Sequence, residues 1–202
     1  MKSLVYIKNY NPPKINKIEV LRYAGVNEEN DELLALLDEC IVDSKDSFSY
    51  KVCYGRFKIE VCADEIDLGF SKTHSHSLAR CLNGCEEIFL ICATVGHKID
   101  RLISKYSVIS PAKAVMLQAL GSERVEALCD MLCSELAAEE GERGFALRPR
   151  FSPGYGDLSL ELQKDIFSCL DCSKNVGVSL NENLLMSPSK SVTAIIGIKK
   201  ES

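Results

Sequence analysis

The stretch "FSYKVCYGRFKIEVCA", residues Phe48 to Ala63, determines how the neighbouring segments must be arranged. Its apolar and polar side chains alternate, and it is rich in Val, Ile, Tyr and Phe, which fit a pleated, half-buried surface. The pattern predicts one long strand or two, with Gly55 as a bend or bulge. A sheet therefore begins here, and the segments on either side must pair with it or pack on it.

Three other segments have the character of strands. The run "EIFLICATV", Glu87 to Val95, is continuously apolar, which is typical of a strand buried on both faces of its sheet. The segment "SVTAIIGI", Ser191 to Ile198, is rich in β-branched residues, and Leu4 to Ile7 has the length of a short strand. These segments are the expected partners of the first.

Helices are expected where apolar residues recur at helical spacing. The longest such segment starts at Ser110-Pro111, a typical helix start, and should run to about Glu139, with Gly121 as a tolerated weak point. Shorter helices are expected from an Asn16 cap to Gly25, over Glu28–Val42, over Thr73–Leu82, from Gly96 through Ile103, and over Leu162–Leu170.

Helices and strands follow one another without strict βαβ alternation, which predicts an α+β fold with a mostly antiparallel, twisted sheet packed with several helices. A chain of 202 residues is long enough for one sizeable core, so residues 1–202 are expected to form a single domain. The hydrophobic share of 46% beside a charged share of 26% is that of a soluble globular protein.

Charge and hydropathy exclude several classes of partner. The net charge is −5 and there is no dense Lys/Arg block, which argues against nucleic acid and against a membrane surface. No run of about eighteen apolar residues occurs, and the apolar run in Met1–Tyr10 is too short for a secretory signal. We therefore expect a cytoplasmic protein whose partner is a small molecule or another protein.

The ten cysteines are many for such a protein. Because export is not indicated, disulfides are not expected, and the thiols are interpreted as buried apolar residues, metal ligands or redox groups. Cys169 and Cys172 form a CxxC pair, which leaves thiol redox or metal chemistry open there. A zinc or iron–sulfur site usually needs two clustered pairs, so no metal ligand is assigned from the sequence.

The stretch "RFSPGYGD", Arg150 to Asp157, combines a turn with groups that can hold a ligand. Its Ser-Pro-Gly-Tyr core fits a type II turn. The planar guanidinium of Arg150 is suited to bind a carboxylate, and Tyr155 offers an aromatic ring and a hydroxyl. Gly154 and Gly156 have no side chains, so a ligand can approach the backbone there. From these residues alone, an ordinary surface turn and a ligand-binding loop both remain open.

The same stretch carries a resemblance to a known family. "RFSPGYGD" followed by "LLMSPSKSVTAIIGI" resembles the activation, or reactivation, domain of cobalamin-dependent methionine synthase, whose hallmark is Arg-x-x-x-Gly-Tyr before a helix and a late Pro-x-x-Ser-Val strand. The similarity extends to "NKIEVLRYAGV", "ATVGHKID" and "VMLQALGSERVEALCD". The matching hallmark residues are Arg150, Gly154, Tyr155, Pro188, Ser191 and Val192.

This resemblance implies that the chain binds S-adenosylmethionine in a shallow site. Arg150 would pair with the carboxylate of this cofactor, Tyr155 would position it, and the backbone near Ser152 and Gly154 would meet its adenine. Glu126 would face the positively charged amino acid part, although its spacing alone indicates a solvated carboxylate at the rim of the apolar stripe. No catalytic residue is implied, because the methyl group is already activated on a sulfonium and needs only to be bound and aimed.

The family presents this methyl group to the cobalt of an oxidised, inactive corrinoid. An electron from a flavodoxin- or ferredoxin-like donor then restores methylcobalamin. This chain has no Asp-x-His-x-x-Gly corrinoid motif, so the resemblance implies a methyltransferase component that is active only with a corrinoid partner. The expected partner is a separate cobalamin-dependent methionine synthase that lacks its activation domain and supplies the cobalamin.

One residue departs from the family pattern. Gly156 follows Tyr155 where the family has proline, which predicts a looser far side of the loop. Two other functions also remain open: a non-catalytic module that binds a corrinoid protein or senses S-adenosylmethionine, and a thiol redox or metal protein that uses the CxxC.

Overall fold

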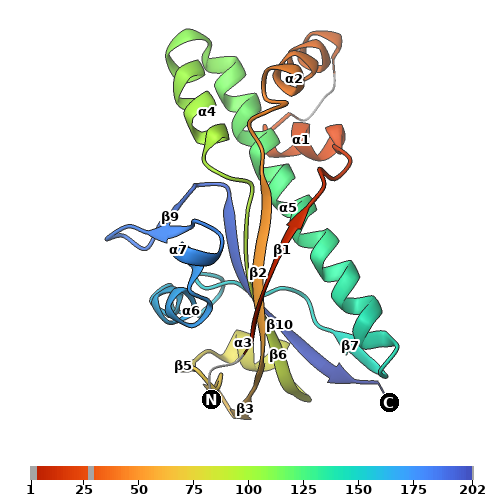
Figure 1. Cartoon of the computed structure of the whole chain (residues 1–202), viewed down its shortest axis with the longest axis vertical. Helices are drawn as coiled ribbons and strands as arrows, with labels where there is room; N and C mark the ends of the chain where they lie inside the picture. The colour runs from red at the N-terminus through yellow and green to blue at the C-terminus, as the bar shows by residue number, and fades with distance from the viewer. Residues whose placement is uncertain (1–3, 27–29, 202) are drawn as a thin grey trace.

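The computed structural model describes residues 4–26 and 30–201. Its centre is an antiparallel sheet whose strands lie along the long axis of the molecule, with a group of helices beyond one end of the sheet (Figure 1). The sheet contains, in spatial order, β1 (Val5–Tyr10), β2 (Tyr50–Lys58), β6 (Cys85–Thr94), β10 (Ser191–Lys200) and β7 (Phe145–Leu147). Every neighbouring pair is antiparallel, which confirms the predicted α+β class.

The stretch from Phe48 to Ala63 forms two strands, β2 and β3 (Glu60–Cys62). Gly55 is neither a bend nor a bulge, because it stays in register with both neighbouring strands. A Cβ atom at this position would lie 2.9 Å from the ring of Phe57 and 3.4 Å from the carbonyl oxygen of Leu4. The glycine therefore makes room for an aromatic ring inside a regular strand, and the prediction of a bulge is wrong.

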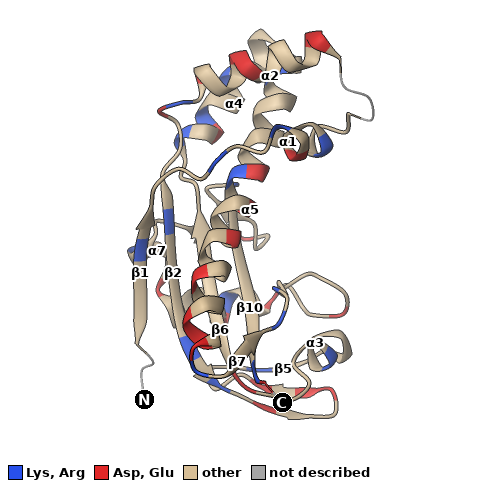
Figure 2. Cartoon of the chain, turned by 90° about the vertical axis from the view of Figure 1, so that its right-hand side faces the viewer, with Lys and Arg blue, Asp and Glu red and all other residues tan. Residues whose placement is uncertain are grey.

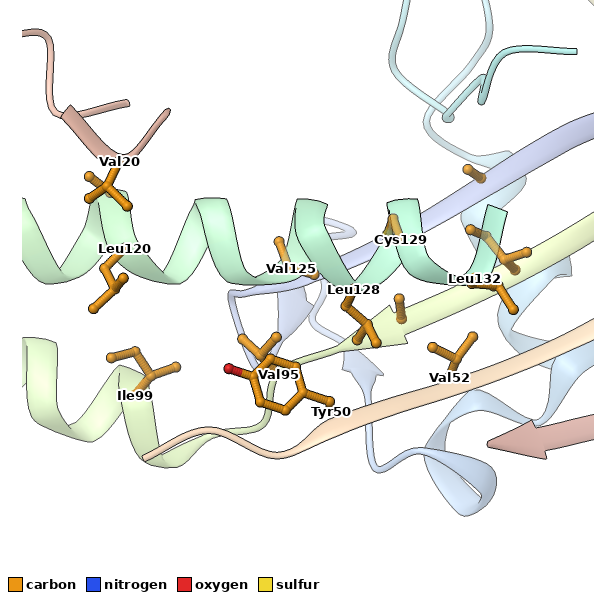
Figure 3. Close-up of a cluster of buried hydrophobic side chains, with 14 of the residues drawn as sticks. Val20, Tyr50, Val52, Val95, Ile99, Leu120, Val125, Leu128, Cys129 and Leu132 are labelled. Carbon is orange, nitrogen blue, oxygen red and sulfur yellow. The ribbon is translucent and has the colours of Figure 1, made fainter. Parts of the chain in front are cut away.

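Helix α5 (Pro111–Gly141) packs along one face of the sheet. Figure 3 shows Leu128 pointing from α5 toward Tyr50 and Val52, while Leu120 faces Ile99 of the neighbouring helix. These side chains belong to a continuous apolar core between the helix and the sheet. Because burial of apolar surface contributes roughly 25 cal/mol per Å², this core is a main source of stability.

The long helix has the predicted bounds to within two residues, and Gly121 has a packing role there. A Cβ atom on Gly121 would lie 3.0 Å from Cγ of Lys190, whose side chain crosses the helix at this point. The Lys190 ammonium donates a 3.0 Å hydrogen bond to Ser122 Oγ. The glycine that weakens the helix thus allows the segment before β10 to lie against it.

Three helices gather at one end of α5 (Figure 1): α1 (Lys17–Tyr23), α2 (Asp31–Asp43) and α4 (Lys98–Ile109). The predicted cap of α1 is confirmed, since Asn16 Oδ1 accepts a hydrogen bond from the N–H of Glu19. The predicted start of the second helix at Glu28 lies outside the described residues, and the described part is capped by Asn30. Figure 2 shows acidic residues following the lower part of α5, away from this end.

The other face of the sheet is covered by α3 (His76–Cys81), α6 (Leu162–Leu170) and α7 (Cys172–Asn175). The helix predicted over Thr73–Leu82 is shorter than expected, because Thr73 lies in β5 (Lys72–His74). This strand pairs with β4 (Glu65–Asp67), which in turn pairs with β3. Ser75 ends the small sheet and caps α3 through its side chain.

A last pair of short strands, β8 (Ser179–Leu180) and β9 (Met186–Ser187), precedes β10. The sequence patterns did not predict these two strands or β7. Across the residues that the structure describes, no helix combines the length and the apolarity needed to cross a bilayer.

Two of the segments that resemble the family, "ATVGHKID" and "SPSKSV", meet where β10 begins. Ser191 Oγ lies 2.8 Å from both Thr94 Oγ1 and the carbonyl oxygen of Pro188. The Asp100 carboxylate accepts hydrogen bonds of 2.8 Å and 2.7 Å from the N–H and the hydroxyl of Ser189. The segments "ATVGHKID" and "SPSKSV" therefore hold each other in place.

Two other segments of the resemblance are joined in the same way. The buried side chain of Arg124 donates hydrogen bonds of 2.5 Å and 2.9 Å to the carbonyl oxygens of Pro13 and Lys14. Glu123 pairs with Arg124 at 2.5 Å and accepts a 3.0 Å hydrogen bond from the N–H of Asn16. These contacts fix the segment before α1 against the middle of α5.

Candidate functional site

A groove of about 1000 Å³ lies along the edge of β10. The strand β7 pairs only with the last residues of β10, and a single bridge joins Phe151 to Ile195. Helix α5 forms one wall of the groove through Glu126, Cys133 and Ser134, and the segment 147–155 forms another. The groove therefore lies beside the part of β10 that has no neighbouring strand on this edge among the described residues.

The edge of β10 presents main-chain groups to this groove. The N–H and C=O of Ile195 both bond to Phe151, at 2.8 Å and 2.9 Å. In an antiparallel strand every second residue points its N–H and C=O toward the same edge, so those of Thr193 point to this side as well. Thr193 also lines the groove, so its main-chain N–H and C=O can form hydrogen bonds with the edge of a flat ligand bound there.

Four of the five residues predicted to bind the cofactor line the groove: Glu126, Arg150, Ser152 and Tyr155. The fifth, Gly154, lies in the turn that joins the last two. Glu126 comes from α5, and the others come from the loop that follows β7. The structure therefore brings together residues that are separated by more than twenty positions in the sequence.

The loop has the predicted turn geometry. The N–H of Tyr155 donates a 3.2 Å hydrogen bond to the carbonyl oxygen of Ser152, and Gly154 has the positive φ of 88° that a type II turn requires. The N–H of Gly154 in turn donates to the carbonyl oxygen of Leu158 at 2.9 Å. Tyr155 is 72% exposed, so its ring stands at the mouth of the groove with little protein cover.

The far side of the loop is tied down, and the looseness expected at Gly156 is wrong. The Asp157 carboxylate accepts hydrogen bonds from the hydroxyl of Ser75 at 2.6 Å and from the N–H groups of His76 and Ser77 at 2.7 Å and 3.1 Å. These hydrogen bonds, above all that from Ser75, hold the pKa of Asp157 well below its usual range. Gly156 has a φ of 56°, which proline cannot adopt.

Arg150 and Glu126 contact each other directly. Nη2 of Arg150 lies 2.9 Å from a carboxylate oxygen of Glu126 and 2.9 Å from one of Asp130. The arginine side chain is 23% exposed, whereas Asp130 lies largely in solvent. One guanidinium is thus placed between two carboxylates at the rim of the groove, where α5 carries its acidic residues (Figure 2).

Three buried polar atoms of groove-lining residues have no hydrogen-bond partner among the described residues: Thr193 Oγ1, Gln163 Oε1 and Arg148 Nε. A buried polar atom of this kind is costly unless something satisfies it. The sequence patterns did not single out these residues, since Thr193 reads as one more β-branched strand residue and Gln163 as a helix residue. They meet at the groove only in the folded chain, since Gln163 lies in α6, Thr193 in β10 and Arg148 in the segment after β7.

The two cysteines of the CxxC do not act as a pair in this structure. Asp171, between α6 and α7, has a φ of 47°, so the helix breaks between the two thiols. Cys172 is fully buried beneath the sheet, whereas Cys169 is partly exposed. Among the other cysteines, Cys85 and Cys129 are buried, which agrees with the interpretation of thiols as apolar core residues.

The sheet order, the long α5 and the groove at the edge of β10 together define a methionine synthase activation-domain-like fold. Among solved structures, the chain is similar to the crystal structure of the MetH reactivation domain bound to AdoHcy, with a TM-score of 0.70 and 15% sequence identity. The match covers 100% of this chain and 80% of that chain. No family model matches the sequence, and no curated protein matches it. At this identity the likeness establishes the fold.

Proposed function

We propose that the chain binds S-adenosylmethionine in the groove along β10 and supports reactivation of a corrinoid on a separate cobalamin-dependent methionine synthase. The observation that carries this proposal is the meeting of Arg150, Glu126 and the Ser152–Tyr155 turn at one groove. The fold adds support, because the similar reactivation domain was crystallised with AdoHcy, the demethylated form of the same ligand.

The rim of the groove suits the amino acid end of this ligand. Both ion pairs of Arg150 use a single nitrogen, Nη2, so other N–H groups of its planar fork can bind a carboxylate. The carboxylates of Glu126 and Asp130 lie beside this guanidinium, where they can attract the ammonium and sulfonium groups of the ligand. One guanidinium between two carboxylates is therefore complementary to a ligand that carries one carboxylate and two positive charges.

The floor of the groove suits the adenine end. The edge of β10 offers the N–H and C=O of Thr193, and Gln163 Oε1 is a buried acceptor without a partner among the described residues. Tyr155 at the mouth can cover the ligand with its ring. Ser152 lines the groove as well, and Gly154 lies in the turn that joins Ser152 to Tyr155.

The chemistry requires binding and aiming, because the methyl group on a sulfonium is already activated. The corrinoid of the partner, once reduced by one electron from a flavodoxin- or ferredoxin-like donor, would accept the methyl group as the carbon–sulfur bond breaks, and S-adenosylhomocysteine would be left in the groove. The residues of this chain hold the methyl group where the partner's cobalt can reach it.

Calorimetry with S-adenosylmethionine tests the binding site. We expect binding by the wild type, and a loss of affinity of at least about tenfold in Arg150→Ala, since a hydrogen bond to a charged group contributes about 1.5–3 kcal/mol. Arg101→Ala, which removes an exposed arginine of α4, is the matched control and should bind normally. Failure of the wild type to bind, or equal binding by both variants, would refute the site.

A transfer assay separates reactivation from ligand sensing. The chain is mixed with a cob(II)alamin-loaded methionine synthase that lacks its activation domain, a reductant, and S-adenosylmethionine labelled on the methyl group. Label on cobalt supports reactivation. Binding of the ligand without transfer of label would favour a sensing or interaction module.

A further inference from the structure

Three cysteines from distant parts of the chain meet beneath the sheet. The Sγ atoms of Cys53 in β2, Cys92 in β6 and Cys172 in α7 all lie within 4.8 Å of one another. Each of the three residues is 0% exposed. Cys53 and Cys92 stand directly opposite each other in the register of their strands, so their thiols emerge on the same face, the one that α6 and α7 cover.

The break in the helix at Asp171 places the third thiol, that of Cys172, beside the other two. In a continuous helix, Cys169 and Cys172 would share one face, but the left-handed backbone of Asp171 turns Cys172 toward the sheet instead. Cys169 does not join the cluster, and burial raises its pKa to about 11, which makes it a poor nucleophile or ligand. The thiol chemistry left open by the CxxC therefore concerns Cys172 with two cysteines of the sheet.

The surroundings of the cluster are apolar. The buried residues on this face of the sheet and on the helices above it include Leu90, Ile166, Leu170, Val178 and Ile195. Among the described residues, no histidine or carboxylate completes a four-ligand group with the three sulfurs. Any ion held here would thus be coordinated by sulfur alone.

We propose that Cys53, Cys92 and Cys172 form a binding site for one Cu(I) ion. Thiolate sulfur is the ligand type that selects Cu(I), and a structural zinc ion is almost always bound by four ligands. Metal–sulfur bonds of about 2.3 Å in a trigonal plane place the sulfurs about 4 Å apart, which agrees with the observed spacing. Because cysteine binds a metal ion as the thiolate, binding displaces the thiol protons of the three residues to solvent.

The groove lies close to the cluster. Thr193 stands directly opposite Cys92 in the register of β10 and β6, and its side chain is on the same face of the sheet. It also lines the groove, and its buried Oγ1 has no partner among the described residues. One residue position on the sheet thus separates the groove from the three thiols.

The test uses the full chain, reduced and kept under nitrogen, with Cu(I) supplied against the competing chelator bathocuproine disulfonate. We expect the wild type to withdraw one equivalent of Cu(I). X-ray absorption at the copper edge should show sulfur as the only neighbouring ligand, and thermal melting should shift upward with copper, because the ion binds the folded state. Retention of all copper by the chelator, or nitrogen or oxygen ligands at the copper, would overturn the proposal.

Variants locate the site. Cys172→Ala should lower the copper affinity by at least about tenfold, since even outer partners of metal ligands contribute 10–100-fold. Cys85→Ala is the matched control, because it removes a buried thiol of the same core outside the cluster, and it should bind copper as the wild type does. An equal loss in both variants, or tighter binding of Zn(II) than of Cu(I) at the cluster, contradicts the proposal. The absorption spectrum of the wild type decides the question if Cys172→Ala does not fold.

Discussion

The glycine at position 156 provides a sharp test of the loop geometry. The family resemblance places proline here, and a proline would be expected to stiffen the loop. The structure predicts the opposite, because Gly156 has a φ of 56° and proline is fixed near −65°. The change of about 120° would turn the chain away from α3 and break the hydrogen bonds that Asp157 accepts there.

The magnitude follows from a series of three substitutions. Each adds a Cβ atom, which would lie 3.0 Å from Oγ of Ser77. Gly156→Ala should cost about 1–2 kcal/mol for left-handed backbone, or roughly 2–8 °C in Tm. Gly156→Asn should cost less, because asparagine tolerates this conformation. Gly156→Pro should cost the most, since the gain of about 0.4–1 kcal/mol from a stiffer unfolded chain does not offset a conformation that it cannot adopt.

Urea unfolding of the three variants, followed by circular dichroism, measures the order. Calorimetry with S-adenosylmethionine on the same proteins reports whether the loop still presents Arg150 and Tyr155 to the groove. We expect Gly156→Pro to bind more weakly than Gly156→Asn. A proline variant as stable as the wild type, with unchanged binding, would refute the conformation described for this loop.

Three further predictions concern single side chains. Because the pKa of Asp157 is lowered in the folded state, its ionised form stabilises the fold above the unfolded-state pKa of about 3.9, and this stabilisation is lost as the pH falls toward the folded-state value. The difference in urea midpoint between wild type and Asp157→Asn should therefore be larger at pH 7 than at pH 3. Arg124→Met leaves Glu123 buried without its partner, so it should cost about 3–5 kcal/mol in unfolding free energy, whereas Arg22→Ala breaks an exposed pair and should cost less than about 1 kcal/mol. Thr193→Val replaces a hydroxyl that has no hydrogen-bond partner among the described residues, so urea unfolding should show a change within about 1 kcal/mol. Calorimetry on the same variant should show weaker binding of S-adenosylmethionine if the ligand uses this hydroxyl.

The main elements could be predicted because their patterns are long. The alternation in Phe48–Ala63, the apolar run in Glu87–Val95 and the helical spacing after Pro111 each extend over enough residues to specify one structure. Strands of two or three residues, such as β7, carry too little pattern to be recognised. Thr73 lies in a strand instead of a helix because the small sheet of β3, β4 and β5 forms through pairing, which local spacing does not show.

The candidate site could be predicted only in part, for a similar reason. Arg150 and Tyr155 lie in a recognisable turn, so the sequence identifies them. Thr193 and Gln163 carry no such local pattern, because only the folded arrangement of β10 and α6 places them at the groove. The cysteine cluster combines residues 53, 92 and 172, and the one short-range signal, the CxxC, pointed to Cys169, which the break at Asp171 separates from the cluster.

The residues that carry the family resemblance fall into two groups with different roles. The segments around Arg124, Asp100 and Ser191 hold helices and strands together through buried or well-formed hydrogen bonds. Arg150 and Tyr155 instead face the groove and hold no core together. The first group stabilises a fold that is similar to that of the reactivation domain over the whole of this chain, at 15% identity. The second group lines the groove, so substitutions there should alter ligand affinity with little effect on stability, whereas substitutions in the first group, such as Arg124→Met, should lower the free energy of unfolding.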